Sequence, residues 1–130
     1  MIRTVFSSFL FLIPIYLSHV CKDTLGLFMF SIAMGISIAN HSHSFHPNKN
    51  RRDLFKRIDI VYIHMLSIYI FLHAFYKFNL IFVLCMGVFN YGVYRQLGQK
   101  SMEYYSSYEK KVHVFFHLIG VFTLTFIRYY

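Results

Sequence analysis

The stretch FNLIFVLCMGVFNYGVY, residues 78 to 94, decides the fold class because it contains no charged side chain. At about 1.5 Å of rise per residue, a helix of this length comes close to crossing the hydrocarbon core of a bilayer. Its apolar residues form an unbroken block, whereas a helix on the surface of a soluble protein would keep a polar face for water. The stretch therefore predicts a transmembrane helix.

The rest of the chain has the same character. Of its 130 residues, 57% are hydrophobic, 21% aromatic and only 14% charged, which is too apolar for a soluble domain of this size. Four further apolar blocks span residues 4–20, 24–41, 58–76 and 112–128. We therefore predict an all-α polytopic transmembrane bundle of about five spans, forming a single domain over residues 1–130.

The first block, which follows Arg3, has two interpretations. An apolar amino-terminal segment after a basic residue is typical of a signal peptide as well as of a first span. No small-x-small cleavage site precedes Lys22 and Asp23, and the bulky Val20 before Cys21 argues against a lipoprotein signal. We expect the block to be retained as a helix.

The basic residues predict the orientation of the chain. Ten of the 13 lie at Arg3 or in the segments 42–57 and 95–111, which share one side of a five-span protein, and three lie on the other side. Under the positive-inside rule, the amino terminus and these two segments are cytoplasmic and the carboxyl terminus is outside. The positive-inside rule thus accounts for the formal net charge of +8, and we expect no nucleic acid partner.

Several ionisable residues are predicted to lie at one depth. His41 ends the second span near the cytoplasmic side, Asp59 begins the third span, and His113 and His117 enter the fifth span from the same side. At 1.5 Å per residue these side chains fall within a layer of about 10 Å. A carboxylate at such a depth needs a partner, because burying it unpaired costs several kcal/mol, although it could simply cap its helix.

The spacing of these residues suggests a metal site. His113 and His117 lie four residues apart on one helical face, so they can offer two nitrogen ligands to one ion, with His41 as a third. Three histidines and an open position for water form a catalytic zinc arrangement. Asp59 would then orient a ligand or deprotonate the water, and Ser37, one turn deeper, would donate a hydrogen bond to the developing oxyanion.

Other interpretations remain open, because one His-x-x-x-His pair arises often by chance among 8 histidines in 130 residues. The chain could be a non-enzymatic membrane receptor or interaction protein in which these side chains only join helices. It could also bind haem or another metal, with the segment HSHSFH, residues 41 to 46, as an entry tract. The sequence assigns no role to the remaining candidates, which are His43, His46, His64 and His73.

The order of the motifs resembles a known superfamily. Ser-x-x-x-His at residues 37–41, a basic loop, Asp59 and a final His-x-x-x-His resemble the membrane metal-dependent hydrolases that include alkaline ceramidases, adiponectin and progestin receptors and bacterial hemolysin III proteins. The step His46-Pro47, the run LFKRID at 54–59 and HVFFHL at 113–118 are most similar to hemolysin III.

The resemblance implies zinc on His41, His113 and His117, with Asp59 and Ser37 as supporting catalytic residues. It implies hydrolysis of a lipid amide or ester, as in a ceramidase or phospholipase, in a bacterial inner membrane or its equivalent. Members of the superfamily have seven spans, so a five-span chain would enclose its lipid substrate by forming a homo-oligomer.

Two positions depart from the superfamily pattern. Asn40 stands where those proteins usually have an aromatic residue, and Ile60 follows Asp59 where they commonly have histidine or tyrosine. A second register, Ser42 to His46, also fits the first motif, but Pro47 disfavours a span that continues through His46.

Overall fold

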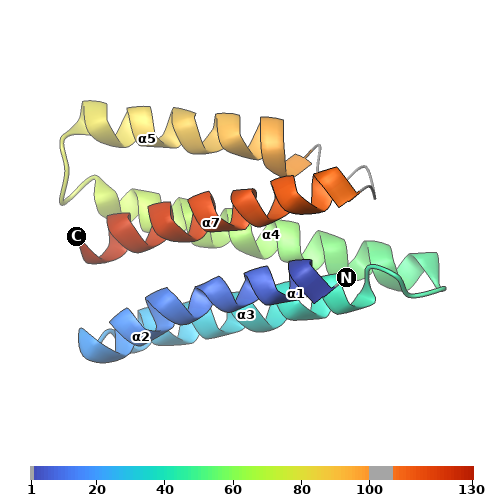
Figure 1. Cartoon of the computed structure of the whole chain (residues 1–130). Coiled ribbons are helices and arrows are strands. Elements are labelled where there is room, and N and C mark those ends of the chain that lie inside the picture. Colours follow the sequence, from blue (N-terminus) through green and yellow to red (C-terminus); the bar gives the residue numbers. More distant parts are fainter. Residues whose placement is uncertain (1, 100–106) are drawn as a thin grey trace. The chain divides into compact units, whose positions relative to one another are not determined.

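The computed structural model describes residues 2–99 and 107–130, and every regular element among them is helical (Figure 1). The elements are α1 (Ile2–Ser8), η1 (Phe9–Phe11), α2 (Leu12–Val20), α3 (Thr24–His43), α4 (Lys49–Ala74), α5 (Leu80–Val93), η2 (Tyr94–Gln99) and α7 (Ser107–Tyr129). The predicted all-α class is confirmed. The segment predicted as a basic loop at 95–111 lies partly outside the described residues.

The chain divides into two compact units, Met1–Leu66 and Ser67–Tyr130, which are described separately. In the first unit, α1, η1 and α2 follow one another and pack along α3. In the second unit, η2 packs against both α5 and α7, and α5 also contacts α7. The prediction of a single domain is not tested by this division and stays a prediction.

Pro14 explains why the first helical stretch contains a short 3₁₀ segment. Proline lacks a backbone N–H and its ring crowds the carbonyl four residues earlier, here that of Leu10. The backbone responds by tightening over Phe9–Phe11, immediately before the α-helix that contains the proline. The predicted block 4–20 is therefore one helical stretch made of three pieces.

A tight corner at Lys22 and Asp23 joins α2 to α3. Lys22 adopts the left-handed conformation, with φ of 55°, and its N–H bonds the carbonyl of His19 while the N–H of Asp23 bonds that of Ser18. These two bonds define a Schellman motif, which satisfies the last carbonyls of a helix. The Asp23 carboxylate then accepts a hydrogen bond from the N–H of Gly26 at 3.0 Å and caps the start of α3.

The helix α4 begins nine residues before the predicted span, at Lys49 rather than Ile58. The Asn48 side chain accepts hydrogen bonds from the N–H groups of Asn50 and Arg51, which satisfies the first turn. Hydropathy analysis detects only the apolar part of a helix and does not detect a charged extension of the same helix. The helix ends at Ala74, two residues before the predicted boundary.

In the second unit, a side-chain cap begins one helix, and buried residues recur with helical periodicity. The Asn79 side chain accepts a hydrogen bond from the N–H of Ile81 at 2.8 Å and caps α5. Ile70 and Ala74 are buried on α4 at a spacing of four residues. The buried apolar residues of α7 are Val121, Leu124 and Ile127. Each set lies on one face of its helix.

Among residues 2–99 and 107–130, two helices are long and apolar enough to cross a membrane by length and composition, Thr24–His43 and Lys111–Tyr129, and the helical stretch Val5–Val20 is shorter but also apolar. Many large apolar side chains point away from the protein. On α5, Ile81, Leu84, Val88 and Tyr91 are between 53% and 74% exposed. These four positions recur every three or four residues and form one outward apolar face. The number of spans and the orientation of the termini stay predictions.

Candidate metal centre

The carboxyl-terminal half of α3 presents Ser37 and His41 on one face, because residues four apart in a helix stack above one another. Both side chains are buried, with 2% and 6% of their surface exposed. The helix continues to His43, so His41 lies inside regular helix and the backbone limits the rotamers that its side chain can adopt.

The Ser37 hydroxyl is paired with a serine from another helix. Its oxygen lies 2.8 Å from that of Ser8 on α1, and both hydroxyls are buried. Either serine can be the donor in this bond. When Ser8 donates, the hydroxyl proton of Ser37 remains available for another acceptor. The pair therefore positions the Ser37 oxygen, and no sequence motif pointed to Ser8.

The carboxylate of Asp59 is held by Asn40. The Asn40 side-chain nitrogen donates to the Asp59 Oδ2 oxygen at 2.6 Å. A bond this short is typical of a charge-assisted hydrogen bond. Asn40, which departs from the superfamily pattern, therefore supplies the partner that the acid was expected to need. It joins α3 to α4 next in the chain to His41.

On α7, His113 and His117 form a close pair. Their ring centroids are 4.5 Å apart, and the two rings are tilted by 57°. His113 is 5% exposed. Phe116 lies beside both rings, with its centroid 6.0 Å from His113 and 6.2 Å from His117, and Tyr94 of η2 packs on Phe116 at 6.1 Å. Phe116 and Tyr94 thus form an aromatic group beside the pair.

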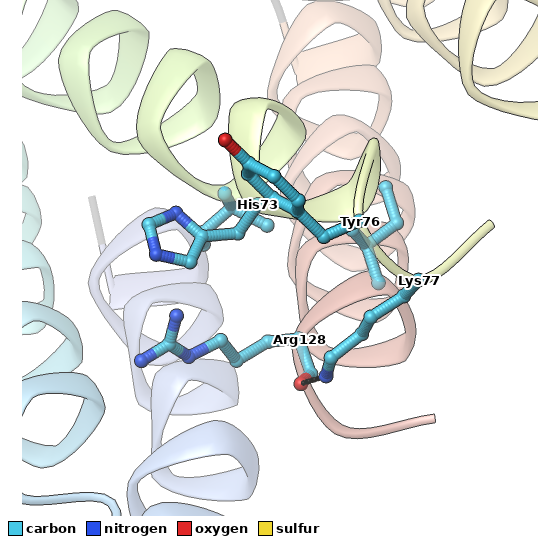
Figure 2. A pocket seen from close by; sticks show the side chains of 6 residues that line it. His73, Tyr76, Lys77 and Arg128 are labelled. Atoms are coloured by element: carbon cyan, nitrogen blue, oxygen red, sulfur yellow. Dashed lines mark hydrogen bonds between the residues drawn. The ribbon is translucent and has the colours of Figure 1, made fainter. Parts of the chain in front are cut away.

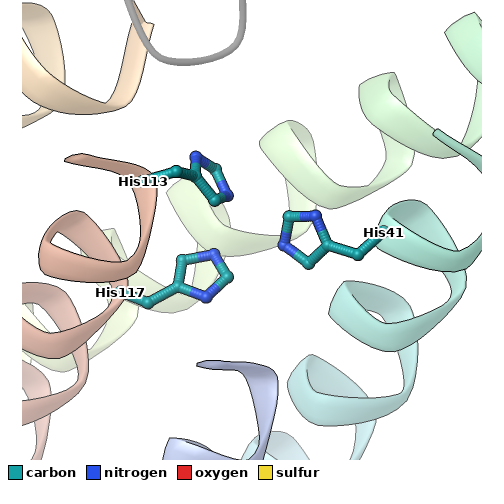
Figure 3. A group of neighbouring side chains, drawn as sticks. All are labelled: His41, His113 and His117. Carbon is teal, nitrogen blue, oxygen red and sulfur yellow. The ribbon is translucent and has the colours of Figure 1, made fainter. Parts of the chain in front are cut away.

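The three predicted ligands form a buried group that could hold a metal ion. His41, His113 and His117 each offer one ring nitrogen, and these nitrogens lie within 4.8 Å of one another (Figure 3). The rings of His113 and His117 come from α7 and that of His41 from α3.

The donor set fits zinc in its chemistry. A tetrahedral zinc ion with bonds of about 2.0–2.1 Å holds its nitrogen ligands roughly 3.4 Å apart. Separations of up to 4.8 Å would therefore shorten by up to about 1.4 Å if all three nitrogens bound one zinc ion. Three imidazoles also leave one tetrahedral position for water or substrate.

Four other histidines have different surroundings. His43 bonds the carbonyl of Ala39 at 2.8 Å and stacks on Phe55, with centroids 4.1 Å apart. His46 contributes its ring nitrogen to the turn at Asn48. His64 and His73 each contact the carbonyl four residues earlier in α4 and are exposed.

Comparisons with known proteins identify no relative. No family model, no curated protein and no solved structure matches the chain. The resemblance to the hemolysin III, receptor and ceramidase superfamily rests on the motifs alone and stays a prediction.

Proposed function

We propose that the chain is a multi-pass membrane protein in which His41, His113 and His117 hold one zinc ion and that it hydrolyses a lipid amide or ester. The observation that carries the proposal is the buried group of three ring nitrogens within 4.8 Å of one another.

The outward apolar faces support the location in a membrane. On α4, Val61, Met65, Ile68 and Leu72 are all more than half exposed, and they continue along the helix at spacings of four, three and four residues. The buried residues Leu66, Ile70 and Ala74 also lie on this helix. A helix with large apolar side chains on both faces suits lipid better than water.

The ligand chemistry supports zinc over harder ions. Imidazole nitrogen suits zinc and other transition metals, whereas magnesium and calcium prefer oxygen ligands. Zinc, when bound, supplies a Lewis acid that polarises a carbonyl or a water molecule.

The protein side chains have distinct roles in the proposed hydrolysis, in which water adds to the carbonyl carbon and the bond to the leaving nitrogen or oxygen breaks. Ser37, positioned by Ser8, donates a hydrogen bond from its hydroxyl to the carbonyl oxygen as negative charge develops there. Asp59, oriented by Asn40, accepts a proton from the attacking water and returns it to the leaving amine or alcohol.

The first test is the metal content of detergent-purified protein. We expect one zinc ion per chain, and we expect the double variant His113→Ala, His117→Ala to lose it. The matched control is His19→Ala, His64→Ala, which removes two exposed histidines and should retain zinc. A wild-type protein without zinc would contradict the proposal. A visible absorption band of haem would show that the protein binds haem instead of zinc.

The second test is a hydrolysis screen with ceramide and phospholipid substrates. Asp59→Asn and Ser37→Ala should retain zinc while lowering turnover, because neither residue is a proposed ligand. Removing a single oxyanion donor typically lowers turnover by about 10²–10³-fold. Zinc binding without any turnover would leave a metal-binding membrane protein and would refute the hydrolase.

A further inference from the structure

The second unit contains a cavity that the proposed function does not use. It has a volume of about 280 Å³ and lies where α4 and α7 end, and it is lined by Ile70, His73, Tyr76, Lys77, Ile127 and Arg128 (Figure 2). Arg128 follows His117 by eleven residues on α7, which separates the two positions by roughly 16 Å along the helix. The cavity is therefore distinct from the histidine pair.

Two of the lining side chains, Lys77 and Arg128, are cationic, and none of the lining side chains is acidic. The Lys77 ammonium donates one hydrogen bond to the backbone carbonyl of Arg128 at 2.7 Å. An ammonium group has three donors, so this bond leaves two for a ligand. The Arg128 guanidinium lies over the ring of Tyr69, 5.7 Å from its centroid, which is a cation–π contact.

The balance of charge at the cavity favours an anion. Two helices end here, and the carboxyl end of each carries a partial charge of roughly −0.5. Lys77 and Arg128 together contribute two full positive charges. The side chains therefore outweigh the helix ends, and the local field attracts negative groups.

The surroundings of the cavity identify the kind of anion. Ile70 and Ile127 are almost completely buried and form an apolar wall, whereas Tyr76 is 92% exposed. Tyrosine is enriched where a membrane meets water, and phospholipid headgroups occupy the same level. The volume lies near the lower limit of about 300 Å³ for ligand sites, which suits a headgroup.

We propose that this cavity binds the phosphate of an anionic phospholipid headgroup. The Arg128 fork contacts two phosphate oxygens, Lys77 adds positive charge to the surroundings of the phosphate, and the apolar wall receives the glycerol end of the lipid. A free inorganic phosphate would share the charge but not the apolar contact.

The test is lipid binding by the full chain in an uncharged detergent, measured by native mass spectrometry. The probes are short-chain phosphatidylglycerol, diacylglycerol with matched acyl chains, and inorganic phosphate. We expect phosphatidylglycerol to bind most tightly. The double variant Lys77→Gln, Arg128→Gln should weaken this binding at least about tenfold, because it removes both cationic groups that attract the phosphate.

Two further variants separate charge from folding. Lys77→Arg keeps the charge and a donor and should retain binding within a few-fold. Lys22→Gln removes an exposed charge in the first unit and should leave binding unchanged. Equal affinity of the wild-type and double-variant proteins would overturn the proposal, and so would inorganic phosphate binding as tightly as the lipid. Zinc content should not change in any of these variants, so this test is independent of the metal site.

Discussion

The hydrogen bond between Asn40 and Asp59 provides the sharpest quantitative test of the first unit. Asn40→Ala and Asp59→Ala each break the bond, and the double variant completes a double-mutant cycle that isolates the energy of the pair. The bond joins α3 to α4 at 2.6 Å, so we expect both single variants to destabilise the folded protein.

The size of the effect follows from burial and charge. A hydrogen bond to a charged group contributes about 1.5–3 kcal/mol, and the short distance supports that class. Both side chains are only half-buried, so we expect an energy near the lower end of the range for hydrogen bonds to charged groups. Neutral interhelical bonds in membrane proteins average about 0.6 kcal/mol and reach about 1.7. We therefore expect a coupling energy of about 1–1.5 kcal/mol, close to tenfold in the unfolding equilibrium.

The assay is reversible unfolding in mixed micelles with an increasing fraction of denaturing detergent. Tyr16→Phe, which changes an exposed residue of α2, serves as a control and should leave stability within about 0.5 kcal/mol. A coupling energy below about 0.3 kcal/mol would refute the reasoning, since pairs without contact normally add within about 0.3–0.5 kcal/mol. The bond would then be too weak to orient Asp59 for proton transfer.

Three other outcomes follow from the described contacts. Asn79→Ala removes the cap of α5 and should lower the unfolding free energy by about 1 kcal/mol, whereas Asn79→Ser should restore most of it. Tyr62→Phe deletes the hydroxyl that donates to the carbonyl of Met29 at 2.9 Å, and the same unfolding assay should show a loss of about 0.5–1.5 kcal/mol. Removing zinc with a chelator should lower the melting temperature of the wild-type protein but not of the His113→Ala, His117→Ala variant, because a ligand stabilises only the state that binds it. An unchanged wild-type melting temperature would contradict the metal site.

Local patterns in the sequence were sufficient to predict the helices. Long apolar blocks gave the positions of all five helical stretches, because hydropathy responds to composition over a window of residues. Boundaries were less accurate. The start of α4 depends on the cap at Asn48, a local hydrogen bond that hydropathy does not contain.

The site shows a similar division between local and distant information. The pairing of His113 with His117 follows from helical spacing alone. The bonds from Ser8 to Ser37 and from Asn40 to Asp59 join residues 29 and 19 positions apart, and only the fold places them together. Neither hydrogen bond could be predicted from neighbouring residues in the sequence, because serine and asparagine also occur in helices without such partners.

The left-handed backbone conformation of Lys22 affects the stability of the corner, and the charge of Lys22 affects the predicted membrane orientation. A residue with a β-carbon in this conformation costs roughly 1–2 kcal/mol, and glycine would avoid that cost. Glycine would also remove one of only three cations predicted outside the cytoplasm. If the predicted topology holds, replacing Lys22 by glycine should therefore strengthen both the corner and the bias toward an inward amino terminus, and lysine at this position would weaken that bias.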